Sequence, residues 1–402
     1  MAELRQNTWS LDEWYDQDVA GNVNYNYGGE LWAWGAGGNG SLGQNAKVNL
    51  SSPTQIGTNT TWKWVTTTHT GNGGYCIKMD NTLWAWGNSG NGMLGQNEDI
   101  GYSSPMQIPG SWKMVEGGRT NVAAIKTNGE LYVWGSNTYG QLGINAEGGP
   151  GRRSSPVQIP GSWRNVDIGY HTMGAVKTNG ELWTWGWGLF GALGLNQSSP
   201  GFPGQAFSSP CQVGSDTDWK DVKCGTHLMA ARKTNNQVYV TGKGDQNGGT
   251  GKNNNTNYSS PVLLPGTWEQ IDCASTDTWS GMMGVKSGGS MYVWGSAYGG
   301  QLGLGVAYGT WARRSSPTLI PGTWDTNGDE SGEQQTICVA KTMAAKREDG
   351  DWYLWGFGGT ANPLGLNQPM SPAPANAVVS PTQLPGTWEV IRSGDQSTVA
   401  TK

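Results

Sequence analysis

The sequence predicts an all-β protein, a seven-bladed β-propeller with four-stranded antiparallel blades. Three observations support this fold class: a repeat with a period near fifty residues, many glycines at fixed places in that repeat, and chain ends that complement each other. Such a period is typical of propellers and solenoids. We expect one closed domain, residues 28–402, preceded by residues 1–27, which do not match the repeat.

Each repeat begins with a Leu-Trp-Ala-Trp-Gly-like run, first seen at residues 31–35. A Leu-Gly step, a Ser-Pro step and a further tryptophan follow. Equivalent runs start at Leu83, Leu131, Leu182, Val238, Met291 and Trp352. The later tryptophans are Trp62, Trp112, Trp163, Trp219, Trp268, Trp324 and Trp388. The fifth run is degenerate, because Thr241 replaces its second tryptophan.

Glycine and proline divide each repeat into four short strands. Thr-Asn-Gly at residues 127–129 and 178–180 is typical of a hairpin turn. Proline after the Ser-Pro step fits the first residue of a strand or an edge strand. Strands this short are not stable alone, so the sheets must stack around an axis to bury their faces.

The chain ends predict how the ring closes. Residues 388–402 match residues 112–126 in length, and Gly394 corresponds to Gly118. The strand that should follow Lys402 is found at the other end of the chain, at residues 31–34. One blade is therefore expected to form by pairing of the N- and C-terminal strands, which removes an open sheet edge.

Composition argues against several classes of function. Charged residues make up 14% of the chain, against about 25% in an ordinary domain. The net charge of −5 argues against nucleic-acid binding, which needs a basic surface. We expect no membrane span, because no run of 18 apolar residues occurs, and no secretory signal, because the N-terminus lacks an apolar segment.

The cysteines indicate core packing. The chain has five, with no C-x-x-C pair. Cys224 and Cys273 each follow a repeat tryptophan by five residues, so they hold equivalent places in adjacent repeats. We interpret them as small buried residues rather than as a disulfide or metal site.

The repeat pattern resembles the regulator of chromosome condensation repeat. The pattern is W-x-x-V, then A-x-K-T-N-G-E-L-Y-x-W-G-x-N-x-x-G-Q-L-G, then S-P, and the most literal copies are residues 131–143 and 291–303. The resemblance covers residues 28–402 and implies a seven-bladed propeller. It implies no single function, since members include exchange factors for a small GTPase and β-lactamase inhibitors. The uniform repeats are also similar to propellers encoded by marine bacteriophages.

No catalytic constellation stands out. His171 and His227 each follow a repeat tryptophan by eight residues, and the resemblance implies a structural hydrogen bond at that corner. The G-x-G-x-x-G match at residues 35–40 has no helix after it and is interpreted as a blade turn. We therefore predict that the protein is not an enzyme and binds no cofactor.

One acidic loop carries oxygen side chains at alternate positions: Asp325, Asn327, Asp329 and Glu333. This spacing is the first half of a calcium loop. Glu330 stands where glycine is needed, however, and Thr336 where a bidentate glutamate belongs. The sequence therefore favours a solvated loop over a metal site.

Two regions are candidates for partner binding. Residues 1–27, here called the arm, contain Trp9, Trp14 and Tyr15 among several acidic residues, and form either a lid or an anchor. The loops between the Leu-Gly and Ser-Pro steps lengthen in four repeats, all expected on one face. They supply the candidate anchors Arg152, Arg153, Trp311, Arg313 and Arg314. The alternative is that these arginines only protect sheet edges and aid solubility.

The sequence thus favours a non-enzymatic protein-binding or structural propeller. We expect a phage virion protein, either a capsid decoration or a tail or adsorption component, whose partners are virion proteins and which could contact a host surface. The alternative is a cytoplasmic regulatory propeller that resembles an exchange factor or an enzyme inhibitor.

Overall fold

Nearly all the regular secondary structure in the described part of the chain is β-strand. The computed structural model describes residues 28–145, 151–197, 206–244, 249–274, 281–297, 300–306, 312–327, 337–338, 341–357, 363–367 and 377–402. Two one-turn 3₁₀ helices, η1 (Gly90–Gly92) and η2 (Leu189–Gly191), interrupt the strands. None of the helices among these residues has the length and apolar character needed to cross a membrane.

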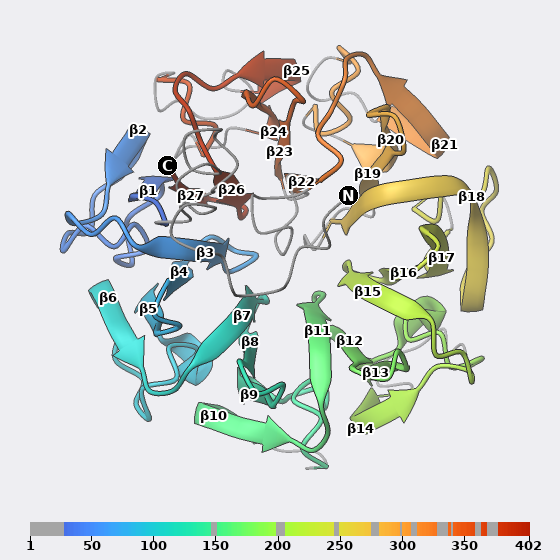
Figure 1. Cartoon of the computed structure of the whole chain (residues 1–402), viewed down its shortest axis with the longest axis horizontal. Helices are drawn as coiled ribbons and strands as arrows, with labels where there is room; N and C mark the ends of the chain where they lie inside the picture. The colour runs from blue at the N-terminus through green and yellow to red at the C-terminus, as the bar shows by residue number, and fades with distance from the viewer. Residues whose placement is uncertain are drawn as a thin grey trace, which may run out of the picture.

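The strands form antiparallel sheets that stand around a central axis (Figure 1). Five sheets have four strands. The first two are β3 (Trp62–Thr67), β4 (Gly73–Lys78), β5 (Leu83–Gly87), β6 (Tyr102–Ile108), and β7 (Trp112–Gly117), β8 (Asn121–Lys126), β9 (Leu131–Gly135), β10 (Arg153–Ile159). The third is β11 (Trp163–Ile168), β12 (Thr172–Lys177), β13 (Leu182–Trp187), β14 (Ala206–Gln212). The last two are β22 (Ile337–Cys338), β23 (Thr342–Lys346), β24 (Trp352–Phe357), β25 (Ala377–Gln383), and β26 (Val390–Ser393), β27 (Ser397–Thr401), β1 (Leu31–Gly35), β2 (Leu50–Gln55).

The remaining sheet has seven strands, which differs from the separate four-stranded sheets that the sequence predicts. Its strands are β15 (Trp219–Cys224), β16 (Leu228–Lys233), β17 (Gln237–Gly242), β18 (Tyr258–Cys273), β19 (Gly281–Lys286), β20 (Met291–Ala297) and β21 (Ala312–Ile320). The 16-residue β18 pairs with β17 through its first part and with β19 through its second. The two units merge because Thr267 still pairs with Gln237, so the strand continues into Trp268.

The two ends of the chain meet in one sheet. β1 pairs with β27 in antiparallel register, with Leu31 opposite Thr401 and Trp34 opposite Thr398. The Glu30 N–H donates to the Lys402 carbonyl at 2.8 Å, and the Lys402 N–H donates to the Glu30 carbonyl at 3.0 Å. This is the strand pairing that the sequence predicts.

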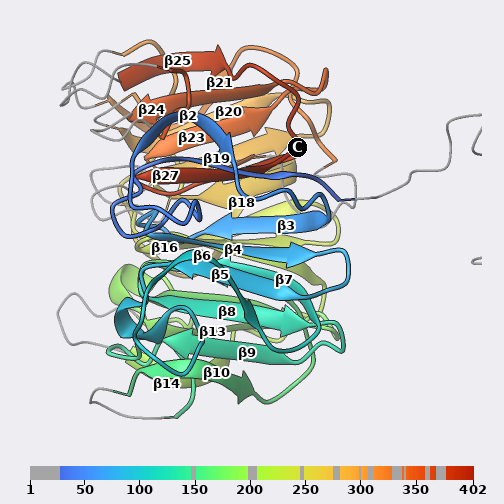
Figure 2. The same ribbon diagram turned by 90° about the vertical axis from the view of Figure 1, so that its left-hand side faces the viewer.

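The ring has two different faces. On the loop face, the ends of the third strands meet the starts of the second strands, as where the Trp187 N–H donates to the His171 carbonyl at 2.9 Å. On the opposite hairpin face, each turn between the second and third strands meets the next inner strand, as where the Trp163 N–H donates to the Gly129 carbonyl at 2.8 Å. The variable connections begin on the loop face. Figure 2 views the strands from the side, and the C-terminus lies on the hairpin side.

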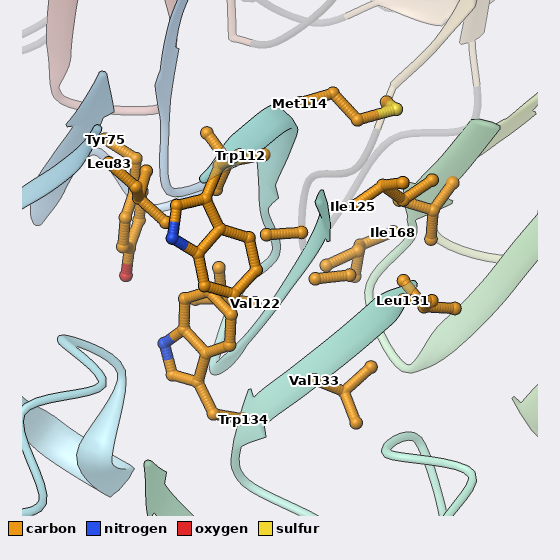
Figure 3. Close-up of a cluster of buried hydrophobic side chains, with 14 of the residues drawn as sticks. Tyr75, Leu83, Trp112, Met114, Val122, Ile125, Leu131, Val133, Trp134 and Ile168 are labelled. Carbon is orange, nitrogen blue, oxygen red and sulfur yellow. The ribbon is translucent and has the colours of Figure 1, made fainter. Parts of the chain in front are cut away.

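Tryptophans of the third strands bind each four-stranded unit to the unit before it. Trp134 is fully buried, and its Nε1–H donates to the Met93 carbonyl of the preceding sheet at 2.6 Å. The same bond, always to the residue before the Leu-Gly step or its equivalent, is made by Trp34, Trp86, Trp185, Trp294 and Trp355. Around Trp134, the side chains of Trp112, Leu131 and Val122 fill the space between sheets (Figure 3).

Inner-strand tryptophans each face a cation and a second aromatic ring. The Lys126 ammonium lies 5.6 Å from the Trp112 ring and 4.2 Å from the Tyr132 ring, and the two rings meet edge-on at 5.5 Å. The same trio occurs in all seven repeats, with an arginine in one of them. Cation–π attraction of this kind contributes about 0.5–1 kcal/mol per contact at an exposed site.

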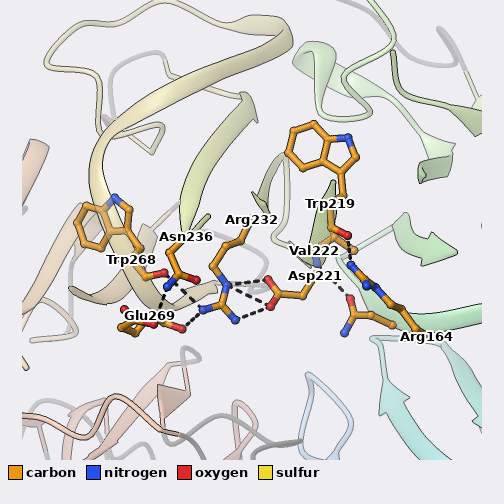
Figure 4. Close-up of polar contacts among 9 residues, drawn as sticks. Arg164, Trp219, Asp221, Val222, Arg232, Asn236, Trp268 and Glu269 are labelled. Carbon is orange, nitrogen blue, oxygen red and sulfur yellow. Dashed lines mark hydrogen bonds and ion pairs between the residues drawn. The ribbon is translucent and has the colours of Figure 1, made fainter. Parts of the chain in front are cut away.

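Arginines add polar links between neighbouring inner strands (Figure 4). Arg164 donates to the Trp219 carbonyl of the next sheet. Arg232 forms an ion pair with Asp221 and also donates to the Glu269 carbonyl. Since each guanidinium joins two blade units, these residues restrict their relative movement.

Candidate interaction face

An aromatic–histidine stripe crosses the loop face over three neighbouring blade units. It is a continuous chain of ring and cation contacts between partly exposed side chains. Its members, in order, are Arg119, Tyr170, His171, Tyr139, Trp187, His227, Phe190 and Lys243.

The centre of the stripe is a stack on the loop after β9. The Tyr139 and Trp187 rings lie 5.3 Å apart with an interplanar angle of 15°. The His171 ring lies 4.2 Å from Tyr139 and 5.8 Å from Trp187. Trp187 can reach this stack because β13 continues one residue beyond the usual glycine.

A cation stands at each end of the stripe. The Arg119 guanidinium lies 4.2 Å from the Tyr170 ring centre, and the Lys243 ammonium lies 4.9 Å from the Phe190 ring centre. Flat rings with flanking cations provide apolar contact area together with positive charge, and aromatic residues and arginine are enriched in protein interfaces.

Phe190 has an unfavourable backbone conformation. Its φ is +59°, in the left-handed region. The equivalent residue after β5 is Asn91, with φ +64°. Asparagine tolerates this region, whereas a side chain such as phenylalanine pays about 1–2 kcal/mol. Strain of this kind is concentrated at functional sites, which makes Phe190 a candidate binding residue.

Both histidines of the stripe are neutral at physiological pH. Burial, then the charges of Arg119 and His227, lowers the pKa of His171 to about 3. Burial and Lys243 lower the pKa of His227 to about 4. The buried Nδ1 atom of His171 has no hydrogen-bond partner within the described part of the chain, so the structural bond implied by the resemblance is not made by this atom. Ring contacts fix this side chain instead.

A second feature, the central charged ring, lines the axis of the propeller. In five repeats the residue four places after the inner-strand tryptophan lines the axis, and these residues are Glu116, Asp167, Lys223, Asp272 and Arg392. The Lys223 ammonium lies 3.5 Å from Asp167, whose other oxygen accepts the Cys224 N–H at 2.6 Å. The cavity between the side chains is about 70 Å³.

The central charged ring perturbs its own acids. Burial raises the pKa of Asp167 to about 7, against the opposing attraction of Lys223. Burial also raises the pKa of Glu116. The acids raise the pKa of Lys223 above its usual value and outweigh its burial, so the ammonium stays charged. We interpret the cluster as a polar link between inner strands.

The arginine pairs predicted to bind partners lie three repeats apart, as the sequence indicates. Arg153 of β10 pairs with Gly135 of β9, and Arg314 of β21 pairs with Gly295 of β20. The two arginines therefore hold equivalent places. β10 and β21 lie on different sides of the ring (Figure 1). Arg152 forms an ion pair with Asp99 at 2.5 Å, and Arg313 stands opposite Ser296. The doublets therefore do not form one patch.

Other predicted residues lie outside the described residues. They are Trp9, Trp14, Tyr15 and Trp311, and the metal candidates Asp329 and Glu333. Of the acidic loop, the described part shows the Asn327 N–H donating to Asp325 Oδ1 at 2.9 Å, a local turn. No group of three or more metal-ligating side chains occurs among the residues that the structure describes.

The predicted cysteine placement is confirmed for the repeat-equivalent pair. Cys224 and Cys273 are buried, with 2% and 4% exposure, and neither forms a disulfide. The aromatic–histidine stripe and the central charged ring were not predicted. A signal for the stripe exists in the repeat alignment, since Trp187 and Phe190 replace the polar residues Asn88 and Asn91. A signal for the ring is the charge at the fourth residue after the inner-strand tryptophan.

Comparison with known proteins identifies the repeat. The family model for the regulator of chromosome condensation (RCC1) repeat matches residues 128–174 and 179–231. The human E3 ubiquitin-protein ligase HERC2 is 26% identical over 192 residues, which are 47% of this chain and 4% of HERC2. The ultraviolet-B receptor UVR8 of Arabidopsis thaliana is 25% identical over 311 residues, 74% of this chain and 67% of UVR8. The chain thus spans a small fraction of HERC2.

Solved structures show the same fold. Human WBSCR16 superposes with a TM-score of 0.74 at 18% identity, covering 92% of this chain and 98% of that one. Prp20p of Saccharomyces cerevisiae gives 0.74 at 16% identity, with 94% of each chain covered. Residues 128–174 and 179–231 of this chain therefore match the repeat of the regulator of chromosome condensation family, and the chain has the fold of WBSCR16 and Prp20p.

Proposed function

We propose that this protein is a non-enzymatic, seven-bladed propeller that binds other proteins through the aromatic–histidine stripe. The count of seven is supported by β18, whose two parts pair with different strands, so that the six sheets contain seven four-stranded units. Pairing of β1 with β27 supports a ring closed through both chain ends.

The observation that carries the proposal is the strained Phe190 next to the stack of Tyr139 and Trp187. A residue that costs folding free energy, at a place where asparagine serves in another repeat, favours a binding role for its partly exposed ring. The charged groups near the axis do not suggest catalysis, because Asp167 is held by Lys223 and by the Cys224 N–H.

The class of partner is a second part of the proposal. Prp20p, which shares the fold, binds Gsp1p and histones. This property of Prp20p favours a cellular regulatory role as the second candidate. The virion role is supported by the nearly uniform sequences of the repeats, which are similar to those of propellers encoded by marine bacteriophages. Co-purification of the protein with phage particles would favour the virion role, whereas its absence from purified particles would favour the regulator.

The binding face can be tested with a variant that keeps the fold. Trp187→Ser with Phe190→Asn installs residues that other repeats use at these places, Ser136 and Asn91. The control is Asn91→Gly, at the equivalent place outside the stripe. Proteins captured from a source-cell lysate by the parent and the control should be lost with the double variant. An identical set of captured proteins for all three would contradict the proposal.

A further inference from the structure

We propose that the stripe of one molecule binds the arm, residues 1–27, of a second copy, so that the protein associates head to tail. This inference rests on the proposed function, since it names an occupant for the same surface. It follows from the chemistry of the stripe, the composition of the arm and the face on which the arm begins.

The arm has a composition that complements the stripe. It carries five carboxylates, at Glu3, Asp12, Glu13, Asp16 and Asp18, against the single cation Arg5. Between and beside them are five aromatic residues, Trp9, Trp14, Tyr15, Tyr25 and Tyr27. Aromatic pairs contribute about 0.5–1.5 kcal/mol beyond buried area, and opposite charges select the partner and speed its approach.

The stripe has the opposite charge pattern. Its ends are Arg119 and Lys243, and its two histidines carry no charge near neutral pH. Neutral imidazoles let the centre accept indole and phenol rings without desolvating a cation. An extended segment with carboxylates spaced around aromatic residues therefore matches a row of rings with a cation at each end.

The arm begins on the face opposite the stripe. The Gly29 N–H donates to the Trp62 carbonyl at 2.7 Å, at the start of an inner strand on the hairpin face. The stripe lies on the loop face, so the arm would have to cross from one face of its own molecule to the other to reach it. In a stack of two molecules, the hairpin face of one lies against the loop face of the next, and the arm meets the stripe directly.

Such an interface is heterologous, because the two molecules contribute different surfaces. It leaves a free arm at one end of the pair and a free stripe at the other, so association continues unless the geometry closes a ring. The average mass in solution should therefore rise steadily with concentration rather than stop at a dimer.

Sedimentation velocity of the full chain at increasing concentration tests this directly. The parent and Asn91→Gly should both show a rising average mass. Deletion of residues 1–24, and separately the double variant Trp187→Ser with Phe190→Asn, should both remain monomeric. A parent that stays monomeric throughout would overturn the proposal, as would association that persists in either variant.

A binding assay supplies the second measurement. A labelled peptide of residues 1–27 should bind the protein that lacks residues 1–24. Its affinity should be at least about tenfold lower for the same truncated protein that also carries Trp187→Ser and Phe190→Asn. Equal binding to both proteins would overturn the proposal. If the double variant loses the proteins captured from lysate while the parent is monomeric, the interaction face stands and the self-association is wrong.

Discussion

Thr241 donates a hydrogen bond from Oγ1 to the Ala192 carbonyl at 2.8 Å, at the place where the other six repeats use an indole N–H. Thr241 is fully buried. The degenerate repeat has therefore lost the tryptophan ring but kept the link between neighbouring blade units. The acceptor, the residue before the Leu-Gly step, is the same in every case.

Thr241→Val should test this link with little change in shape. Loss of the hydroxyl leaves the Ala192 carbonyl unsatisfied, and the free energy of unfolding should fall by about 1–3 kcal/mol. The measurement is denaturant unfolding. Thr178→Val is the control, because its hydroxyl is exposed, and it should change the value by less than about 0.5 kcal/mol. Equal effects at both sites would show that the buried bond does not matter.

Trp134→Ala should be much more harmful. It removes a fully buried indole between two sheets together with the bond to the Met93 carbonyl, and the expected cost is about 3–5 kcal/mol. Trp134→Phe restores part of the packing but not the bond. We expect its thermal midpoint to lie between those of the parent and the alanine variant, and a midpoint equal to the parent's would argue that the bond contributes nothing.

Deletion of residues 397–402 should open the propeller. β27 lies between β1 and β26, so its loss leaves β26 without a strand partner and β1 paired only with β2, and it exposes sheet edges. Light scattering should show aggregation, and the melting temperature should fall by many degrees. The deletion of residues 1–24 is the control, since it spares β1. A truncated protein that melts like the parent would refute the proposed closure.

The buried acid Asp167 should make stability decrease with rising pH. Its folded pKa, about 7, lies above the ordinary value near 4, so the folded state holds a proton that the unfolded state releases. The contribution of the protonated Asp167 to the free energy of unfolding is full below pH 4 and is lost as the pH rises to 7. Asp167→Asn should therefore gain stability relative to the parent across this interval. A difference between the two that is independent of pH would contradict the raised pKa.

His171 should make stability decrease as the pH falls. The pKa of His171 is about 3, below the ordinary 6.5, so the unfolded state takes up the proton first as the pH falls. Its contribution is full above pH 6.5 and is lost toward pH 3. His171→Phe keeps a ring beside Tyr139 and removes the titration. Its unfolding free energy should decline less steeply than the parent's over that range, and parallel declines would exclude this role.

The repeat made most of the fold predictable. The strand pairing of residues 31–34 with 398–401 could be predicted because residues 112–126 supply a complete copy for comparison. The merging of two units through β18 could not, because it depends on whether Thr267 retains a strand partner, and similar Pro-Gly steps elsewhere end the strand.

The candidate site was less predictable for a different reason. Tyr139, Trp187 and His227 belong to three repeats and become neighbours only through the arrangement of the blade units. A repeat alignment shows that Trp187 is unusual at its place, but not which side chains it meets. The distance between the predicted arginine doublets follows from the repeat itself, because Arg153 and Arg314 hold equivalent places three repeats apart, and their role in binding remains a prediction.

The adjacency of Glu30 and Lys402 means that the order of the repeats along the gene is not essential to the fold. A Thr-Asn-Gly linker between them would recreate the turn that joins Lys126 to Glu130, and a new start could be opened at any other hairpin. Circular permutants of this protein should therefore fold. In each permutant the arm could be attached to a different blade. The direction in which one molecule joins the next could then be redesigned.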